Sequence, residues 1–116
     1  MHSIVLDKVR IFAHHGVLPQ ERVTGAYFII DVKIQTDFTH AMETDELEGT
    51  ISYADIYDIL KREMAIPSKL LEHVGGRIVK SIYSRYTNIN KVYLRIIKEN
   101  PPMGADLAGA GIEIEQ

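Results

Sequence analysis

The sequence predicts an α+β domain in which a four-stranded antiparallel sheet carries two helices on one face, in the order β-β-α-α-β-β. Three observations predict it. Two segments in the first third alternate apolar and polar residues with the period of a strand. Two segments in the middle repeat apolar residues at helical spacing, and two strand-like segments follow. Residues 65–69, between the helices, leave no room for the strand that a ferredoxin-like β-α-β-β-α-β order needs. For the remaining order, both helices on one face of the sheet is the simplest layered arrangement.

The first two predicted strands cover residues 3–11 and 26–38. The second is typical of an antiparallel strand with one face on a core and the other in water. Its apolar side consists of Phe28, Ile30, Val32, Ile34 and Phe38. The connection between the strands, residues 12–25, is longer than the roughly two to five residues of a hairpin loop, which indicates a functional role.

The first predicted helix starts after Ser52, a suitable N-cap residue. Its apolar stripe consists of Tyr53, Ile56, Tyr57, Leu60 and Met64. The second carries Leu71, Val74, Ile78 and Ile82 on one stripe. Gly75 and Gly76 lie inside it, and each costs about 1 kcal/mol relative to alanine. Either the helix breaks there, or a neighbouring element approaches its backbone closely.

Residues 91–98 and 111–115 are the last two predicted strands, and Pro101 and Pro102 end the first of them. The chain has 116 residues, of which 46% are hydrophobic, so residues 1–116 are expected to form a single domain. The absence of cysteine excludes disulfides and thiolate metal sites and fits a reducing compartment. We therefore expect a cytoplasmic protein.

The longest apolar runs are far shorter than a membrane span, and the early Asp7 and Lys8 do not fit a secretory signal. The net charge of −3 favours no polyanion, so neither a membrane nor a nucleic acid is expected as a partner. Charge is nevertheless divided: residues 34–60 lack Lys and Arg, whereas residues 61–98 are mainly basic. This division predicts two solvated faces that attract each other, within the chain or between subunits. The alternative is an anion-binding face.

Three residues are candidates for chemistry from their positions alone. Lys98 shares a strand face with the apolar side chains before it. Its amine is either partly desolvated, which suits proton transfer, or reaches water at the end of an alkyl chain that lies along the apolar surface. Tyr53 is either a core tyrosine or a buried phenol with a hydrogen-bond partner. Glu72 either complements the helix dipole or, beside free space at Gly75 and Gly76, accepts two N–H donors from a flat ligand. The histidines show no metal-ligand spacing.

Five segments together resemble the dihydroneopterin aldolase family of folate biosynthesis, which has the tunnelling fold and the same order of elements. They are HHGVLPQE at 14–21, SYADIYDI at 52–59, LLEHV at 70–74, KENPP at 98–102 and GAGIEI at 109–114. Two departures stand out. Gly75-Gly76 replaces the usual Ala-Glu of the family, and the turn after Pro102 has lost one proline.

The resemblance implies an aldehyde-lyase that splits 7,8-dihydroneopterin into 6-hydroxymethyl-7,8-dihydropterin and glycolaldehyde. The C=N unit of the pterin ring accepts the electrons of the broken bond, so the family needs no metal, cofactor or Schiff-base lysine. The catalytic residues implied are Lys98 for proton transfer, Tyr53 for the proton at the ring-side carbon, and Glu21, which positions Lys98 and the substrate diol.

The implied pterin-binding residues are Glu72, which grips the amino and ring N–H groups, and the backbones of Leu71 and Ile51, with Tyr53 and Glu21 helping to hold the substrate. Such sites lie between subunits of a homo-oligomer, tetrameric rings stacked as an octamer. Two alternatives stay open: epimerisation of dihydroneopterin or its triphosphate by the same residues, and a non-catalytic pterin-binding or assembly protein. A nucleic-acid module built on the basic stretch is a rival class, but the sequence lacks the basic aromatic signature and the order of elements that such a module needs.

Overall fold

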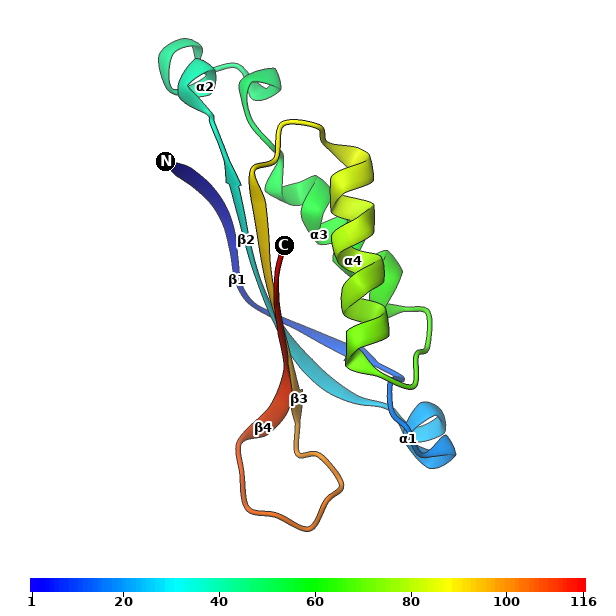
Figure 1. The fold of residues 1–116 in the computed structure, drawn as a ribbon. Coiled ribbons are helices and arrows are strands. Elements are labelled where there is room, and N and C mark those ends of the chain that lie inside the picture. Colours follow the sequence, from blue (N-terminus) through cyan, green and yellow to red (C-terminus); the bar gives the residue numbers. More distant parts are fainter.

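The structure, a computed structural model, describes all residues 1–116. Four antiparallel strands form one sheet in the order β1-β2-β3-β4, and helices α3 and α4 cross between β2 and β3 on one face of it (Figure 1). This arrangement confirms the predicted fold class and the order of the main elements. Their bounds are β1 His2–Ala13, β2 Ala26–Thr36, α3 Tyr53–Met64, α4 Leu71–Arg85, β3 Lys91–Glu99 and β4 Gly109–Glu115.

Three short helices were not predicted. They are α1 (Pro19–Thr24), α2 (Thr39–Thr44) and the 3-10 helix η1 (Leu47–Gly49). The predicted extension of the second strand to residue 38 was also wrong, because β2 ends at Thr36. Phe38 instead caps α2 and stacks on His2, with ring centroids 4.3 Å apart. Helices α1 and α2 lie at opposite ends of the elongated molecule (Figure 1).

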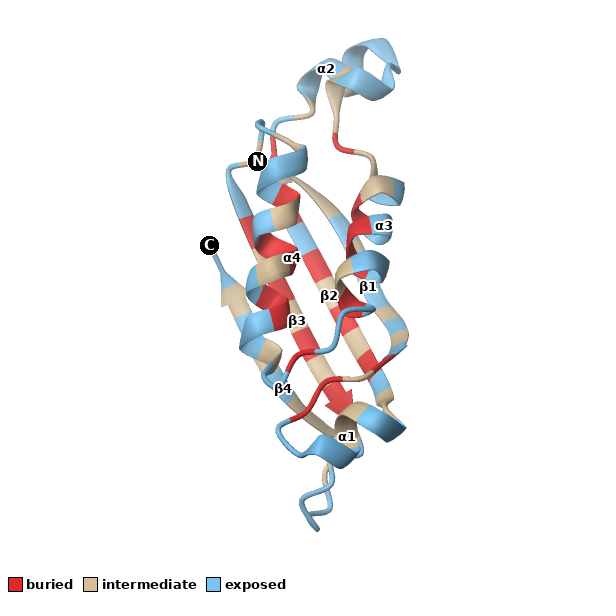
Figure 2. Cartoon of the chain, turned by 90° about the vertical axis from the view of Figure 1, so that its right-hand side faces the viewer, coloured by how far each residue is buried: buried red, intermediate tan, exposed pale blue.

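The core lies between the sheet and the two long helices, where the buried residues face one another (Figure 2). The predicted stripe of α4 is confirmed for Val74, Ile78 and Ile82, which are fully buried. The predicted stripe of α3 is partly wrong. Ile56, Leu60 and Met64 are buried as predicted, but Tyr53 and Tyr57 are 68% and 43% exposed, and Ile59 is buried in their place.

Helix α4 continues unbroken through Gly75 and Gly76, so a close neighbour explains the first glycine. A Cβ atom on Gly75 would lie 2.8 Å from Ile114 Cδ1, because β4 packs against the helix at this point. The free space predicted at Gly75 is therefore taken by the sheet. Gly76 has nothing within 4 Å and faces outward.

A bulge interrupts β1 and explains why its apolar alternation is imperfect. The register with β2 skips between Leu6 and Val9, and Lys8 has a left-handed backbone with φ of 54°. The Lys8 N–H donates to Asp31 Oδ1 at 2.8 Å, which satisfies a donor that the bulge removes from the ladder. Asp7 and Lys8 therefore fall out of the alternation of inward and outward side chains, although the strand continues past them.

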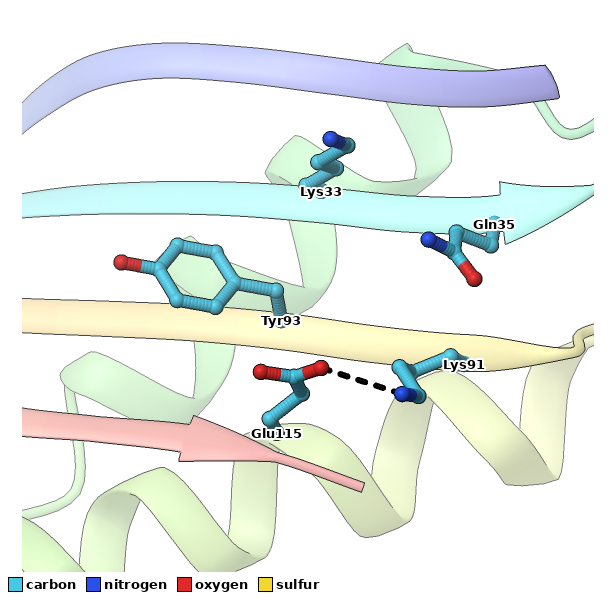
Figure 3. Close-up of a pocket in the computed structure, with 5 residues that line it drawn as sticks. All are labelled: Lys33, Gln35, Lys91, Tyr93 and Glu115. Carbon is cyan, nitrogen blue, oxygen red and sulfur yellow. Dashed lines mark hydrogen bonds and ion pairs between the residues drawn. The ribbon is translucent and has the colours of Figure 1, made fainter. Parts of the chain in front are cut away.

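The polar side chains predicted on the second strand, Asp31, Lys33 and Gln35, lie on the face of the sheet away from the helices. Figure 3 shows part of it, where Lys91 Nζ lies 3.0 Å from Glu115 Oε1 beside Lys33, Gln35 and Tyr93. The acidic and basic stretches of the sequence contact each other within the chain, because Arg85 of α4 forms an ion pair with Asp55 of α3 at 2.8 Å. None of the helices has both the length and the apolar character that a membrane crossing requires.

Candidate active site

The Lys98 side chain is buried at the end of β3, on the core side of the sheet. It is 8% exposed, and its Nζ donates to the His15 carbonyl at 2.8 Å and to Glu21 Oε1 at 2.6 Å. The predicted placement on the apolar face is confirmed, and the amine does not snorkel to water. An amine withdrawn from water and held by two acceptors is oriented for proton transfer to a neighbouring group.

Glu21 reaches Lys98 because the predicted loop contains a short helix. Pro19 occupies the first turn of α1, where its missing N–H is not needed, and Glu21 follows at the third helical position. Glu21 Oε2 accepts the Leu18 N–H at 3.0 Å and so caps the helix, while Oε1 faces Lys98. The Lys98 hydrogen bond, opposed by desolvation and assisted by the Leu18 N–H, holds the pKa of Glu21 below its ordinary value.

Gly16 makes room for this carboxylate. A Cβ atom at position 16 would lie 2.5 Å from Glu21 Cδ, closer than two such atoms can approach. The loop backbone therefore passes directly beneath Glu21. Any side chain at this position has to push Glu21 away from Lys98.

A hollow of about 270 Å³ opens beside Lys98 and Glu21. Glu72 and Leu71, from the first turn of α4, line its other side, together with Pro101 from the turn after β3. One chain thus brings four of the six predicted site residues around a single space. Glu72 is exposed and makes no hydrogen bond within the chain, so both of its oxygens are free to accept N–H donors.

The other two predicted residues lie elsewhere. Helix α3 starts at the end of the molecule where α4 finishes (Figure 1), so Tyr53 lies at the far end of the helical layer from Lys98. The 12 residues of α3 separate the two ends by about 17 Å along its axis. The Tyr53 phenol is 68% exposed and has no hydrogen-bond partner, and Ile51 beside it is buried. The prediction of a buried Tyr53 was wrong.

His15 belongs to this site but was not predicted as part of it. Its side chain is 1% exposed, and Nδ1 accepts the Ser68 N–H at 3.0 Å. Burial and, next, the cation of Arg77 lower the pKa of His15 to about 4, so the ring is neutral near pH 7. The sequence offered only a pair of adjacent histidines without metal-ligand spacing, and nothing in that pattern signals burial. No group of three or more metal-ligating side chains gathers in the structure.

The family model for dihydroneopterin aldolase matches residues 4–115. A Staphylococcus epidermidis protein named dihydroneopterin aldolase is 37% identical over 112 residues, which are 96% of this chain and 93% of that protein. The chain belongs to the dihydroneopterin aldolase family. Its relatives of that name are aldehyde-lyases, and the enzyme class predicted from the sequence is confirmed at this level.

Solved structures of family members share the fold. The E. coli dihydroneopterin aldolase in complex with neopterin superposes with a TM-score of 0.91 at 21% identity, covering 100% of this chain and 99% of that one. A Burkholderia dihydroneopterin aldolase bound to guanine has a TM-score of 0.79 at 14% identity, over 99% and 89% of the two chains. The tunnelling fold of the family is therefore also the fold of this chain.

Proposed function

We propose that this chain cleaves 7,8-dihydroneopterin by a retro-aldol reaction. The bond between the first two side-chain carbons breaks as the second hydroxyl loses its proton, and the second carbon leaves as the aldehyde carbon of glycolaldehyde. The electron pair moves into the C=N unit of the ring, whose nitrogen takes up a proton. Protonation of the first carbon and loss of the nitrogen proton then give 6-hydroxymethyl-7,8-dihydropterin, with no net oxidation.

One observation carries this proposal: the Lys98 amine is withdrawn from water and paired with Glu21 at 2.6 Å, at the edge of a hollow that also contains Glu72. Lys98 moves protons to and from the substrate, directly or through one water. Glu21 orients the amine and the diol of the substrate. These roles need a positioned amine and a carboxylate, and the pair supplies both.

Glu72 binds the pterin edge, where a ring N–H and an amino group lie side by side and match the two oxygens of a carboxylate. The family member complexes with neopterin and with guanine support this class of ligand, because guanine has the same amino-pyrimidinone edge as a pterin. The backbone of Leu71 adds contacts on the same side of the hollow. Glu72 thus contributes to binding more than to the chemical step.

Tyr53 and the backbone of Ile51 act in the active site of a neighbouring subunit. Tyr53 starts α3 at the far end of the helical layer from the Lys98 hollow, and α3 is about 17 Å long, so the phenol does not reach a substrate held beside Lys98 of the same chain. A homo-oligomer whose subunits meet through opposite ends of the helical layer unites the two halves. Tetrameric rings stacked as an octamer, in the cytoplasm, are the assembly that we propose.

The decisive experiment incubates the purified chain with 7,8-dihydroneopterin and measures glycolaldehyde and the pterin product, with and without EDTA. We expect both products in equal amounts, unaffected by EDTA. The stereoisomer of the substrate without glycolaldehyde would identify an epimerase instead. Binding of neopterin with neither product would identify a non-catalytic pterin-binding protein, and full inhibition by EDTA would contradict the metal-free mechanism.

A further inference from the structure

The loop that carries the carbonyl acceptor of Lys98 is fastened by contacts that the proposed reaction does not use. The His15 carbonyl accepts from Lys98 Nζ in a buried position, so the direction of the amine depends on where residues 14–16 lie. Within the loop, Arg22 Nη1 donates to the Gly16 carbonyl at 2.7 Å. The contacts of His15 itself come from distant parts of the chain.

Ser68, in the connection between α3 and α4, makes two hydrogen bonds with this loop. Its N–H donates to His15 Nδ1, and its carbonyl accepts the Gly16 N–H, both at 3.0 Å. The His15 ring also packs edge-on against Phe28 of β2, with centroids 5.3 Å apart. The ring, and with it the carbonyl of the same residue, is therefore held from two sides.

Ser68 is itself anchored. It is 5% exposed, and its Oγ accepts from Arg77 Nη2 at 2.9 Å and lies 2.9 Å from His73 Nδ1. Arg77 also donates to the carbonyl and to the carboxylate of Glu63 at 2.9 Å. Both long helices thus hold the connection that holds the loop. This series of contacts connects the two long helices to the buried Lys98 amine.

We propose that His15 is a positioning residue for Lys98: by accepting the Ser68 N–H, its neutral ring places its own carbonyl where the amine needs it. The inference rests on the proposed role of Lys98 in proton transfer. His15 acts through Lys98 and not on the reacting atoms. Loss of the ring acceptor leaves the Ser68 N–H unpaired. The contacts at Gly16 remain, but the His15 carbonyl, one of the two partners of Lys98, is less firmly placed.

The test compares His15→Leu with His15→Asn. Leucine keeps apolar bulk but accepts no hydrogen bond, whereas the asparagine amide oxygen reaches the place of Nδ1. We expect His15→Leu to lower kcat about tenfold or more with KM changed less than about threefold, and His15→Asn to recover most of kcat. His14→Leu is the matched control, because the ring of His14 makes no contact with Ser68, and it keeps the wild-type kcat.

A second measurement is independent of turnover. The folded protein is treated with limiting acetic anhydride, and acetylation of Lys98 is compared by mass spectrometry with that of exposed Lys80 on α4. We expect the ratio of Lys98 to Lys80 modification to rise several-fold in His15→Leu and to stay at the wild-type level in His15→Asn. A wild-type protein that does not cleave the substrate refutes the proposed function, and the acetylation ratio then still decides the position of Lys98.

If His15→Leu does not fold, His15→Gln replaces it, because its longer side chain moves the amide oxygen away from the Ser68 N–H. The proposal is overturned if the folded variant without the acceptor keeps the wild-type kcat and acetylation ratio. It is equally overturned if His15→Asn is as impaired as His15→Leu in both measurements. Rescue by asparagine alone supports it.

Discussion

The two ends of the helical layer hold their functional side chains differently. At one end, Lys98 is 8% exposed and bonded to two acceptors, and Glu21 is fixed both by the amine and by the Leu18 N–H. At the other, the Tyr53 phenol is 68% exposed and has no partner. The chain by itself positions the amine and its counter-ion, whereas no contact within the chain holds the phenol. Under the proposed function, these are two incomplete halves of one site that a single fold supplies.

The largest effect is expected from removal of the prepared amine. Lys98→Ala is predicted to lower kcat by about 10²–10⁴-fold, the range for loss of a positioned acid or base. Neopterin affinity, measured by calorimetry, is expected to change little, because the proposed contact of Glu72 with the pterin ring is kept. A variant that turns over at the wild-type rate contradicts the role of Lys98.

Mixing two inactive variants tests whether the Tyr53 phenol acts in the active site of a neighbouring subunit. Lys98→Ala and Tyr53→Phe are each expected to have low activity as pure proteins. Denatured together in equal amounts and refolded, they are predicted to regain about one quarter of wild-type activity, because that share of two-chain sites receives an intact Lys98 and an intact Tyr53. If the mixture stays as inactive as its parts, the two residues do not meet across a subunit boundary.

The buried His15 gives the Lys98 end a specific pH dependence of stability. Its pKa is about 4 in the folded chain, against 6.5 in the unfolded chain, so only the unfolded state binds a proton between these values. The contribution of His15 to the free energy of unfolding is therefore complete above pH 6.5 and decreases as the pH falls towards 4. The total loss from this group is about 3 kcal/mol.

The measurement is the free energy of unfolding in denaturant at a fixed protein concentration, at pH 6.5 and at pH 4.5. His15→Asn is expected to show a smaller loss than wild type between these pH values, because asparagine does not titrate. The same loss in both proteins would show that the His15 ring does not resist protonation in the folded state.

Glu72→Gln is predicted to weaken pterin binding more than turnover. One oxygen and the charge of the carboxylate are lost, and charge-assisted hydrogen bonds of this kind contribute about 1.5–3 kcal/mol. We expect KM to rise about tenfold or more with a smaller change in kcat. Steady-state kinetics separate the two constants, and an unchanged KM would place the pterin elsewhere.

The smallest effect is expected at the Tyr53 end. Tyr86 Oη donates to Asp55 and accepts the Ser52 N–H at 3.3 Å, which fastens the start of α3. Tyr86→Phe is predicted to cost about 1–2 kcal/mol of unfolding free energy, because it removes two partly exposed hydrogen bonds, one of them to a carboxylate. Neopterin affinity is expected to remain at the wild-type level. A loss of affinity instead would mean that the position of this helix end matters for the ligand.

The sequence predicted the sheet, the two long helices and the position of Lys98 on the apolar face of its strand, because period-two and helical patterns directly report which face meets the core. Whether the Lys98 amine is buried or reaches water was left open by the pattern. It misplaced Tyr53, since aromatic residues follow the helical spacing whether they face a core or an interface. The helix at 19–24 escaped detection because six residues are too few for periodicity, although Pro19 and Glu21 marked its first turn.

The contacts of His15 with Ser68 and of Glu21 with Lys98 could not be predicted from the local pattern. Each joins residues more than fifty positions apart in sequence, and the pairing is decided by how the strands and helices pack. The resemblance to the dihydroneopterin aldolase family identified Lys98, Glu21 and Glu72 as site residues, but it does not describe the buried His15. Packing alone brought that residue to the amine.

Glu21 both caps the short helix α1 and pairs with the Lys98 amine, so the stability of this helix depends on the ion pair. Six residues do not hold a helix by themselves in water, so α1 depends on the cap that Glu21 closes with the Leu18 N–H. When the amine gives up its proton, the attraction that steadies this carboxylate weakens. The same weakening in Lys98→Ala is expected to speed hydrogen exchange at the Leu18 amide.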